Sequence, residues 1–185
     1  MCVKTEKRGE MTERSKPATR ESWTFVKPLP QQRAALSFER AFTEEEYELI
    51  RQGVIPEEME NKWFIFVEED VLYVHRSWTG FCMYQVRLKK EGAEYRVVEA
   101  FANRDSNQYS ATDDHYDVKL LNFLIDHFLL GRSSTFPVPP GVATGIATRL
   151  YQHHVAGLRP RTREEKTPRS AARWFCAWLK WLIRG

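Results

Sequence analysis

The pattern of apolar and polar residues predicts four consecutive β-strands in the middle of the chain. Aromatic and β-branched residues dominate residues 62–68 and 71–76, and apolar and polar residues alternate over residues 81–88. A fourth run of this kind covers residues 95–101, and only short turns separate one run from the next. Turns this short join antiparallel neighbours. We therefore predict a four-stranded antiparallel meander from Lys62 to Ala102.

Helical spacing of apolar residues precedes and follows this sheet. Thr43 and Glu46 have the spacing of a capping box, in which each side chain reaches a free backbone N–H at the start of a helix over residues 42–52. Asp113 can cap a second helix over residues 113–130, whose apolar stripe is too broad for a surface helix. We expect both helices to pack on one face of the sheet, which gives an α+β fold.

Composition divides the chain into an arm, a body and a tail. Residues 1–21 contain ten charged side chains and few apolar ones, so we expect a disordered arm. Residues 22–154 contain the strands and helices of a single α+β domain, with a weak further helix over residues 142–154. Residues 155–185 hold eight Lys or Arg and two Glu, and are predicted to form a basic linker followed by an amphipathic helix.

The predicted helix in the tail carries three tryptophans on one stripe. Trp174, Trp178 and Trp181 recur at helical spacing, and cationic side chains surround them. A helix of this kind is typical of a membrane interface, where indole rings lie at the level of the headgroups, or of a groove on a partner protein. A helix folded back over the open face of the chain's own sheet has the same pattern. The sequence leaves these three interpretations open.

Length, charge and cysteine usage narrow the class of protein. The chain has 185 residues, of which 42% are hydrophobic, and it shows neither an apolar run long enough to span a bilayer nor a signal-peptide pattern. Its three cysteines lie far apart, which argues against a disulfide framework and favours the reducing cytoplasm, with the tail at a membrane surface as an alternative. The net charge of +3 belongs to the arm and tail, so no specific nucleic-acid binding is expected of the acidic body. No metal site and no cofactor are predicted.

The densest group of chemically useful side chains follows the second predicted strand. It comprises Arg76, Ser77, Trp78 and Thr79, and it precedes Gly80. Arg76 could hold a phosphate or carboxylate and Trp78 could stack on a ring, which suits a nucleotide-derived or other anionic ligand. A turn stabilised by its hydroxyl side chains, with Trp78 in the core, would explain the same residues.

A second group lies in the loop after the fourth predicted strand and comprises Asn103, Arg104 and Asp105. Strands two and four of a meander run in the same direction, so Arg104 and Arg76 are expected at one end of the sheet. Two arginines that converge on a concave surface would favour a ligand-binding domain. Arginines that point apart would favour a non-enzymatic interaction module, in which Asp105 only stabilises its turn.

Known catalytic templates are incomplete in this sequence. Ser77 and His75 share a strand face but have no carboxylate fixed beside them, and Cys82 lies in an apolar strand, where a core position is usual. Adjacent carboxylates such as Asp113 and Asp114 are usually solvated or cap a helix. The sequence therefore does not decide whether the protein is an enzyme.

Three short segments resemble an uncharacterised family of small bacterial proteins. They are Met59-Glu60-Asn61-Lys62-Trp63-Phe64-Ile65, His75-Arg76-Ser77-Trp78-Thr79-Gly80 and Asn103-Arg104-Asp105. The family pattern consists of a (D/N)KWFI strand, a (Y/H)RSWTG turn, an NRD loop and an Asp-rich helix start, and the match covers about residues 42–131. The resemblance implies an association with modules that act on ADP-ribose, and thus nucleotide or ADP-ribose chemistry. It assigns no catalytic residue.

Overall fold

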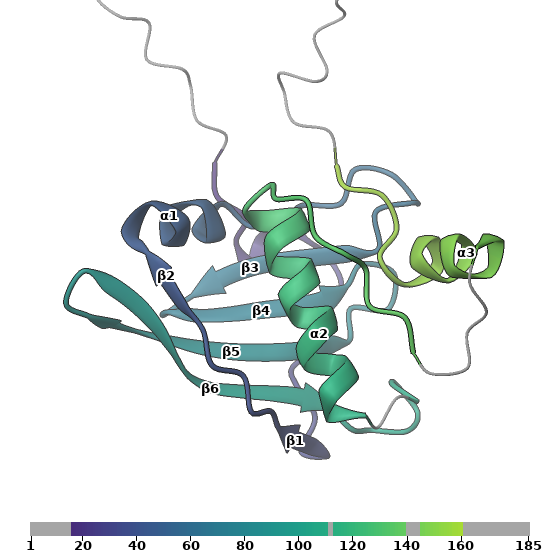
Figure 1. Ribbon diagram of the computed structural model, residues 1–185, viewed down its shortest axis with the longest axis horizontal. Coiled ribbons are helices and arrows are strands. Elements are labelled where there is room, and N and C mark those ends of the chain that lie inside the picture. The colour runs from purple at the N-terminus through teal and green to yellow at the C-terminus, as the bar shows by residue number, and fades with distance from the viewer. Residues whose placement is uncertain (1–15, 111–112, 140–144, 161–185) are drawn as a thin grey trace, which may run out of the picture.

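The computed structural model describes residues 16–110, 113–139 and 145–160 of the chain. It is an α+β fold in which a long helix crosses one face of an antiparallel sheet (Figure 1). The predicted fold class is therefore confirmed. In the part of the chain that the structure describes, no helix has the length and apolar character needed to cross a membrane.

The sheet contains six strands, two more than predicted. The four predicted strands form the expected meander and are β3 (Trp63–Glu68), β4 (Val71–Arg76), β5 (Cys82–Glu91) and β6 (Glu94–Asn103). The two additional strands are β1 (Arg33–Ala35) and β2 (Ala41–Thr43), and both pair with the edge of β6 that faces away from β5. The prediction of a four-stranded sheet was therefore wrong in the number of strands.

The two additional strands are too short to show a period in the sequence. β1 and β2 have three residues each, and a run of that length has no measurable alternation. They lie along opposite ends of β6, where Arg33 pairs with Asn103 and Thr43 pairs with Glu94. Hydrogen bonding to an otherwise unpaired sheet edge, which is a tertiary contact, therefore selects these strands.

Helix α1 (Glu44–Gln52) begins and ends as the sequence predicts. Thr43 Oγ1 accepts a hydrogen bond from Glu46 N at 3.3 Å, and the Glu46 carboxylate accepts one from Thr43 N at 2.9 Å. Gly53 ends the helix with a φ of 66°, and a Cβ at this position would lie 2.3 Å from Ile65 O. The capping box is therefore confirmed, and the close approach of β3 explains why a glycine follows α1.

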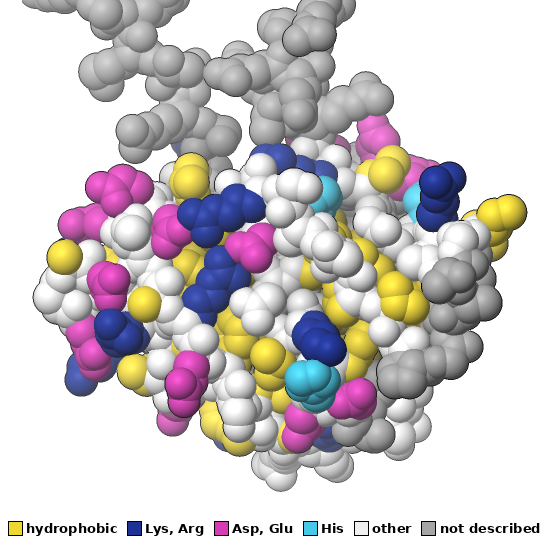
Figure 2. Space-filling view, in the orientation of Figure 1, with side chains coloured by type: hydrophobic (Ala, Val, Ile, Leu, Met, Phe, Trp, Pro, Cys, Tyr) yellow, Lys and Arg dark blue, Asp and Glu magenta, His cyan; other side chains and the backbone are white. Residues whose placement is uncertain are grey.

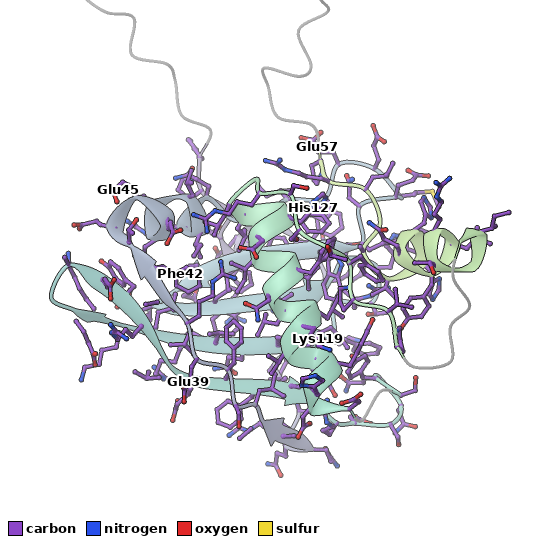
Figure 3. All side chains as sticks on the ribbon, in the orientation of Figure 1. Glu39, Phe42, Glu45, Glu57, Lys119 and His127 are labelled. Carbon is purple, nitrogen blue, oxygen red and sulfur yellow. The ribbon has the colours of Figure 1, made fainter. Side chains whose placement is uncertain are left out.

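Helix α2 (Asp114–Leu124) continues into a π-helical turn, η2 (Ile125–Leu129). Asp113 caps α2 by accepting hydrogen bonds from two backbone N–H groups of the first turn. The exposed Lys119 lies on the outer side of α2, away from the sheet (Figure 3). The helix predicted over residues 113–130 is therefore present, although its last turn is wider than an α-helical turn.

The two faces of the sheet are covered by different parts of the chain. Helices α1 and α2 cover one face, and the main core lies between them and inward side chains such as Ile65 and Val74. On the opposite face Phe64 and Phe66 form a second cluster with Ala18. The N-terminal segment therefore provides apolar cover for the face that the helices leave open.

The limits of the body differ in part from the predicted ones. Ala18 N donates a hydrogen bond to the carbonyl that ends α1, at 2.9 Å, and Arg20 forms an ion pair with Glu68 at 3.0 Å. The end of the segment predicted as an arm thus packs on the body, and the rest of it lies outside the described residues. Helix α3 (Ile146–Val155) occupies the place of the predicted weak helix. The predicted tail helix with its tryptophans also lies outside the described residues.

A β-bulge in β5 changes which side chains reach the main core. Val74 pairs with Tyr84 and His75 pairs with Cys82, so Met83 is an extra residue on β5. Because of this extra residue, Met83 and Tyr84 both belong to the core under the helices. In a regular strand, two neighbouring residues would point to opposite faces.

Candidate functional site

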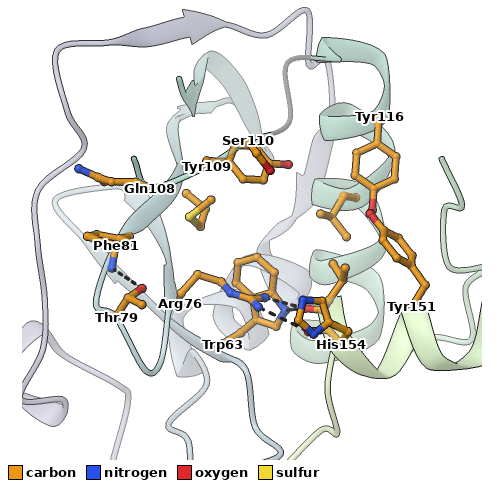
Figure 4. Close-up of a pocket in the computed structure, with 13 residues that line it drawn as sticks. Trp63, Arg76, Thr79, Phe81, Gln108, Tyr109, Ser110, Tyr116, Tyr151 and His154 are labelled. Atoms are coloured by element: carbon orange, nitrogen blue, oxygen red, sulfur yellow. Dashed lines mark hydrogen bonds between the residues drawn. The ribbon is translucent and has the colours of Figure 1, made fainter. Parts of the chain in front are cut away.

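A pocket of about 360 Å³ lies between one end of the sheet, α2 and α3. Apolar side chains gather between the positions of these two helices (Figure 2). The pocket is lined from the strand ends, from the loop after β6 and from both helices (Figure 4). Much of the lining is aromatic and comes from Trp63, Phe81, Tyr109, Tyr116 and Tyr151.

Arg76, the last residue of β4, supplies a permanent positive charge to this pocket. Its Nη1 donates a hydrogen bond to Val155 O at 2.7 Å, and its Nη2 reaches His154 O at 3.5 Å. The guanidinium carbon lies 4.7 Å from the centre of the Trp63 ring. The two carbonyl groups belong to the C-terminal end of α3, where the helix dipole is negative. Arg76 therefore attaches α3 to the end of the sheet.

Arg76 has no carboxylate partner among the residues that the structure describes. Burial lowers its pKa, and the groups that oppose this effect are the phenol groups of Tyr84 and Tyr109 rather than any acid. A guanidinium nevertheless keeps its charge at neutral pH. The pocket thus contains a partly desolvated cation that, among the described residues, contacts two helix carbonyls and the Trp63 ring, and such a cation favours the binding of an anion.

A buried hydrogen-bond network fixes the wall opposite Arg76. Asp117 is fully buried on α2 and accepts hydrogen bonds from Tyr84 OH at 2.7 Å and from Tyr109 OH at 2.5 Å. Arg104 Nη2 donates to the second Asp117 oxygen at 2.6 Å. Burial and the Asp117 charge raise the pKa of Tyr109, so its hydroxyl stays protonated and continues to donate. The Tyr109 ring is therefore a neutral wall with a fixed position.

Other polar groups of the pocket fall into two kinds. The hydroxyl groups of Tyr116 and Tyr151 lie 3.2 Å apart and join α2 to α3, so they are engaged with each other. The Ser110 hydroxyl and the His154 ring line the pocket, and neither contacts a hydrogen-bond partner within the described residues. These two groups can therefore interact with a bound molecule.

The turn after β4 directs successive side chains to different places. Arg76 and Thr79 line the pocket, whereas Trp78 is 58% exposed in a separate groove. The Ser77 hydroxyl is buried and donates a hydrogen bond to Asn61 O at 2.7 Å. The structure therefore does not bring Arg76 and Trp78 together on one ligand, and it does not place Trp78 in the core either.

The second predicted group, in the loop after β6, builds the loop and does not line the pocket. Asn103 is buried, its Nδ2 donates to Cys82 O at 2.9 Å, and its Oδ1 accepts from Asp105 N at 2.9 Å. Arg104 forms ion pairs with Asp117 and Asp114, so its charge is neutralised. Arg104 and Arg76 lie at the same end of the sheet, as expected, but they do not converge on one pocket, because Arg76 lines it and Arg104 does not.

Several pocket residues had no role in the predicted site. From the loop, Gln108 and Ser110 reach the pocket in place of the residues before them, and a polar loop gives no sign of which side chains turn inward. Tyr151, His154 and Val155 come from α3. Their spacing of three and four residues places them on one helical face, which is the signal that could have identified them.

Metal binding and nucleophilic catalysis receive no geometric support in the described residues. No three His, Cys, Asp or Glu side chains there could together hold a metal ion. His75 Nδ1 lies 3.0 Å from Gly80 O, and its ring packs against apolar neighbours. Burial raises the pKa of the Cys82 thiol to about 12, so this thiol is not a nucleophile at neutral pH. Cys82 is therefore a core residue, and the His75 ring is held in the turn through Nδ1, while its buried Nε2 has no hydrogen-bond partner among the described residues.

Comparison of the chain with protein families, with curated proteins and with solved structures finds no match. The resemblance to a bacterial family in the strand, turn and loop segments thus stays a prediction.

Proposed function

We propose that the protein binds a small ligand that combines a planar ring with one anionic group, such as a nucleoside monophosphate. The observation that carries this proposal is the environment of Arg76. It is a partly buried cation that has no carboxylate partner among the described residues and that lies in an aromatic-lined pocket. Ligand pockets characteristically combine apolar walls with a few polar groups of this kind.

The anionic group of the ligand would lie against Arg76. Two N–H groups of the guanidinium contact helix carbonyls, and a guanidinium has five N–H donors, so others are available to a phosphate or carboxylate. The Ser110 hydroxyl and the His154 ring provide further hydrogen bonds around the same space. Charge-assisted hydrogen bonds from Arg are about twice as strong as neutral ones, which makes Arg76 the main determinant of affinity.

The ring of the ligand would lie between the aromatic side chains. Phe81, Tyr109 and Tyr116 offer neutral surfaces on which a planar ring stacks. The volume of about 360 Å³ is near the lower end of the range for ligand pockets, and Arg104 does not contribute a second cation. A compact ligand with one charged group therefore fits better than ADP-ribose, which carries two phosphates and two riboses.

A thermal-shift titration with AMP, adenosine, inorganic phosphate and ADP-ribose tests this function. A ligand at 100 times its Kd stabilises a protein by about 2.7 kcal/mol, which corresponds to a rise in Tm of about 5–11 °C for a chain of this size. We expect AMP to give the largest rise and adenosine or phosphate alone to give much smaller ones. Equal Tm values with all four compounds at millimolar concentration would contradict the proposal.

Two variants show whether Arg76 acts through its charge. Replacing Arg76 by Met should weaken AMP binding about 10- to 100-fold, because one or two charge-assisted hydrogen bonds are lost. Arg76 also attaches α3, so adenosine binding to the same variant must be measured and should change little. Trp78→Phe is the control, since Trp78 lies outside the pocket, and its AMP affinity should equal that of the native chain.

The alternative function, a non-enzymatic interaction module, is supported by the failure of Arg76 and Arg104 to converge on one pocket and by a second surface. Phe25, Met59 and Trp78 are each more than half exposed and lie around one groove. Exposed apolar side chains that are grouped together are typical of interaction sites. This surface does not overlap the lining of the Arg76 pocket, so the two functions do not exclude each other.

A further inference from the structure

We propose that the groove beside Trp78 binds the chain's own C-terminal segment, residues 169–184. The groove has a volume of about 430 Å³ and is lined mainly by apolar side chains. Phe25 is 57% exposed and Met59 is 64% exposed at its surface. Aromatic and Met side chains adapt well to an apolar helix face, which makes this surface suitable for such an occupant.

The indole of Trp78 is held in a fixed orientation at this groove. Its Nε1 donates a hydrogen bond to Met59 O at 3.1 Å, and Lys62 Nζ lies 4.9 Å from the ring centre. The indole N–H is therefore satisfied before anything binds, and the ring does not lose rotational freedom when a partner covers it. A preorganised aromatic surface of this kind binds with a smaller entropic cost than a flexible one.

The chain leaves the described part of the structure next to this groove. Leu158 N donates a hydrogen bond to Glu60 O at 2.9 Å, and Asn61 Nδ2 donates to Leu158 O at 2.9 Å. The same Asn61 side chain accepts hydrogen bonds from the backbone N–H groups of Glu57 and Glu58, which line the groove. One buried asparagine therefore joins the exit of the chain to the wall of the groove, and Figure 3 shows Glu57 at the same end of the molecule.

The linker between the last described residue and residues 169–184 is long enough for this segment to reach the groove. The eight residues 161–168 span up to about 26–29 Å when extended, which is ample for a groove that begins beside Glu60. A helix over residues 169–184 would be about 24 Å long. A tether this short keeps the local concentration of the segment in the millimolar range, so it outcompetes a second copy of the chain for the groove.

Charge and side-chain type are complementary between the groove and the segment. Glu57 and Glu58 line the groove and Glu60 follows in the sequence, whereas residues 161–185 hold seven Lys or Arg and two Glu. Trp174, Trp178 and Trp181 recur at helical spacing and would present one apolar face. The Trp face can cover Met59 and Trp78 while the basic side chains approach the acidic side chains of the groove.

A nitroxide label on Cys176 tests the proposal in the full-length chain. Cys176 lies two residues from both Trp174 and Trp178, hence on the opposite side of a helix, where a label does not obstruct the Trp face. Cys2 is replaced by Ser, and Cys82 is buried and unreactive. We expect the paramagnetic label to remove most of the NMR signal intensity of the Trp78 indole N–H.

Two substitutions of the same kind identify the contact. Met59→Lys places a repulsive charge in the groove and should restore the Trp78 indole signal. Val98→Lys introduces the same charge at an exposed position of β6, which β5 and β4 separate from β3, and should leave the broadening unchanged. The circular dichroism spectrum of both variants should equal that of the native chain, since both replaced side chains are exposed.

Three results would overturn the proposal. An undiminished Trp78 signal in the labelled chain would mean that the segment binds a membrane or another protein instead. Broadening of the Trp78 signal of an isotope-enriched chain without a label, when it is mixed with labelled chains that are not enriched, would identify a second copy as the occupant. Broadening that persists in the Met59→Lys variant would place the segment elsewhere on the body.

Discussion

Replacing Asp117 by Asn should destabilise the protein much more than the same replacement at the neighbouring Asp114. Asp117 is fully buried, and its two oxygens accept hydrogen bonds from Tyr84, Tyr109 and Arg104. Asparagine keeps the shape of the side chain but removes its charge. It also places an NH₂ group at the position of an oxygen that accepted a hydrogen bond. At least one donor therefore loses its acceptor in a region without access to water.

The size of this effect follows from the partners that remain. Removing one member of a buried ion pair costs about 3–5 kcal/mol, and Arg104 keeps a second partner in Asp114, so we expect the lower value of about 3 kcal/mol. For a chain of this size, that corresponds to a fall in Tm of about 6–12 °C. Urea unfolding followed by tryptophan fluorescence gives the free energy of unfolding directly.

The matched control is Asp114→Asn. Asp114 pairs with the same arginine, but its side chain is 58% exposed, so its loss should cost less than about 1 kcal/mol. If Asp117→Asn also costs less than about 1 kcal/mol, the buried network does not stabilise the fold in the way described. In that case Tyr109 would not be a fixed wall of the pocket either.

Two further predictions concern the turn after β4. Burial lowers the pKa of His75 below its unfolded value of about 6.5, so the unfolded state binds more protons below that pH and stability falls as the pH decreases. Between pH 6.5 and 5 this loss of stability is at most about 2 kcal/mol. In His75→Phe, the free energy of unfolding should therefore fall less between pH 7 and pH 5 than in the native chain. An identical pH dependence in the variant would refute this prediction. Gly80→Ala should destabilise the chain by about 1–3 kcal/mol, because φ is 70° and a Cβ would lie 2.5 Å from Phe25 O. Gly92 has a similar φ of 63°, but no atom lies within 4 Å of a Cβ added there. Urea unfolding should therefore show a smaller loss of stability for Gly92→Ala than for Gly80→Ala. Equal losses would exclude the steric contact with Phe25 as the cause.

Local patterns in the sequence were sufficient for the elements whose contacts are themselves local. The meander follows from alternating runs joined by short turns, and the ends of α1 follow from Thr43, Glu46 and Gly53. The helix-end contacts join residues a few positions apart, and the strand pairings join segments that are consecutive in the chain, so the sequence pattern reports both directly. The same reasoning placed Arg76 and Arg104 at one end of the sheet.

The contacts that Arg76 and Arg104 make at this end of the sheet depend on residues far away in the sequence. The carbonyl that contacts Arg76 is 79 positions away, and the carboxylate that neutralises Arg104 is buried on α2, although an Asp at a helical position usually faces solvent. The short strands β1 and β2 also depend on their pairing partner, since three residues show no period in the sequence. The same holds for the bulge at Met83, because one extra residue in a strand leaves no pattern of its own.

The sequence by itself therefore determined the fold class, the central strands, the helix caps and the residue types available for a site. Only the tertiary structure decided that Arg76 faces a pocket with Tyr109 and Tyr151, whereas Trp78 faces a groove and Arg104 is neutralised. The physical reason is that periodicity and capping depend on neighbours within one or two turns, while burial and charge pairing depend on which segments meet in space.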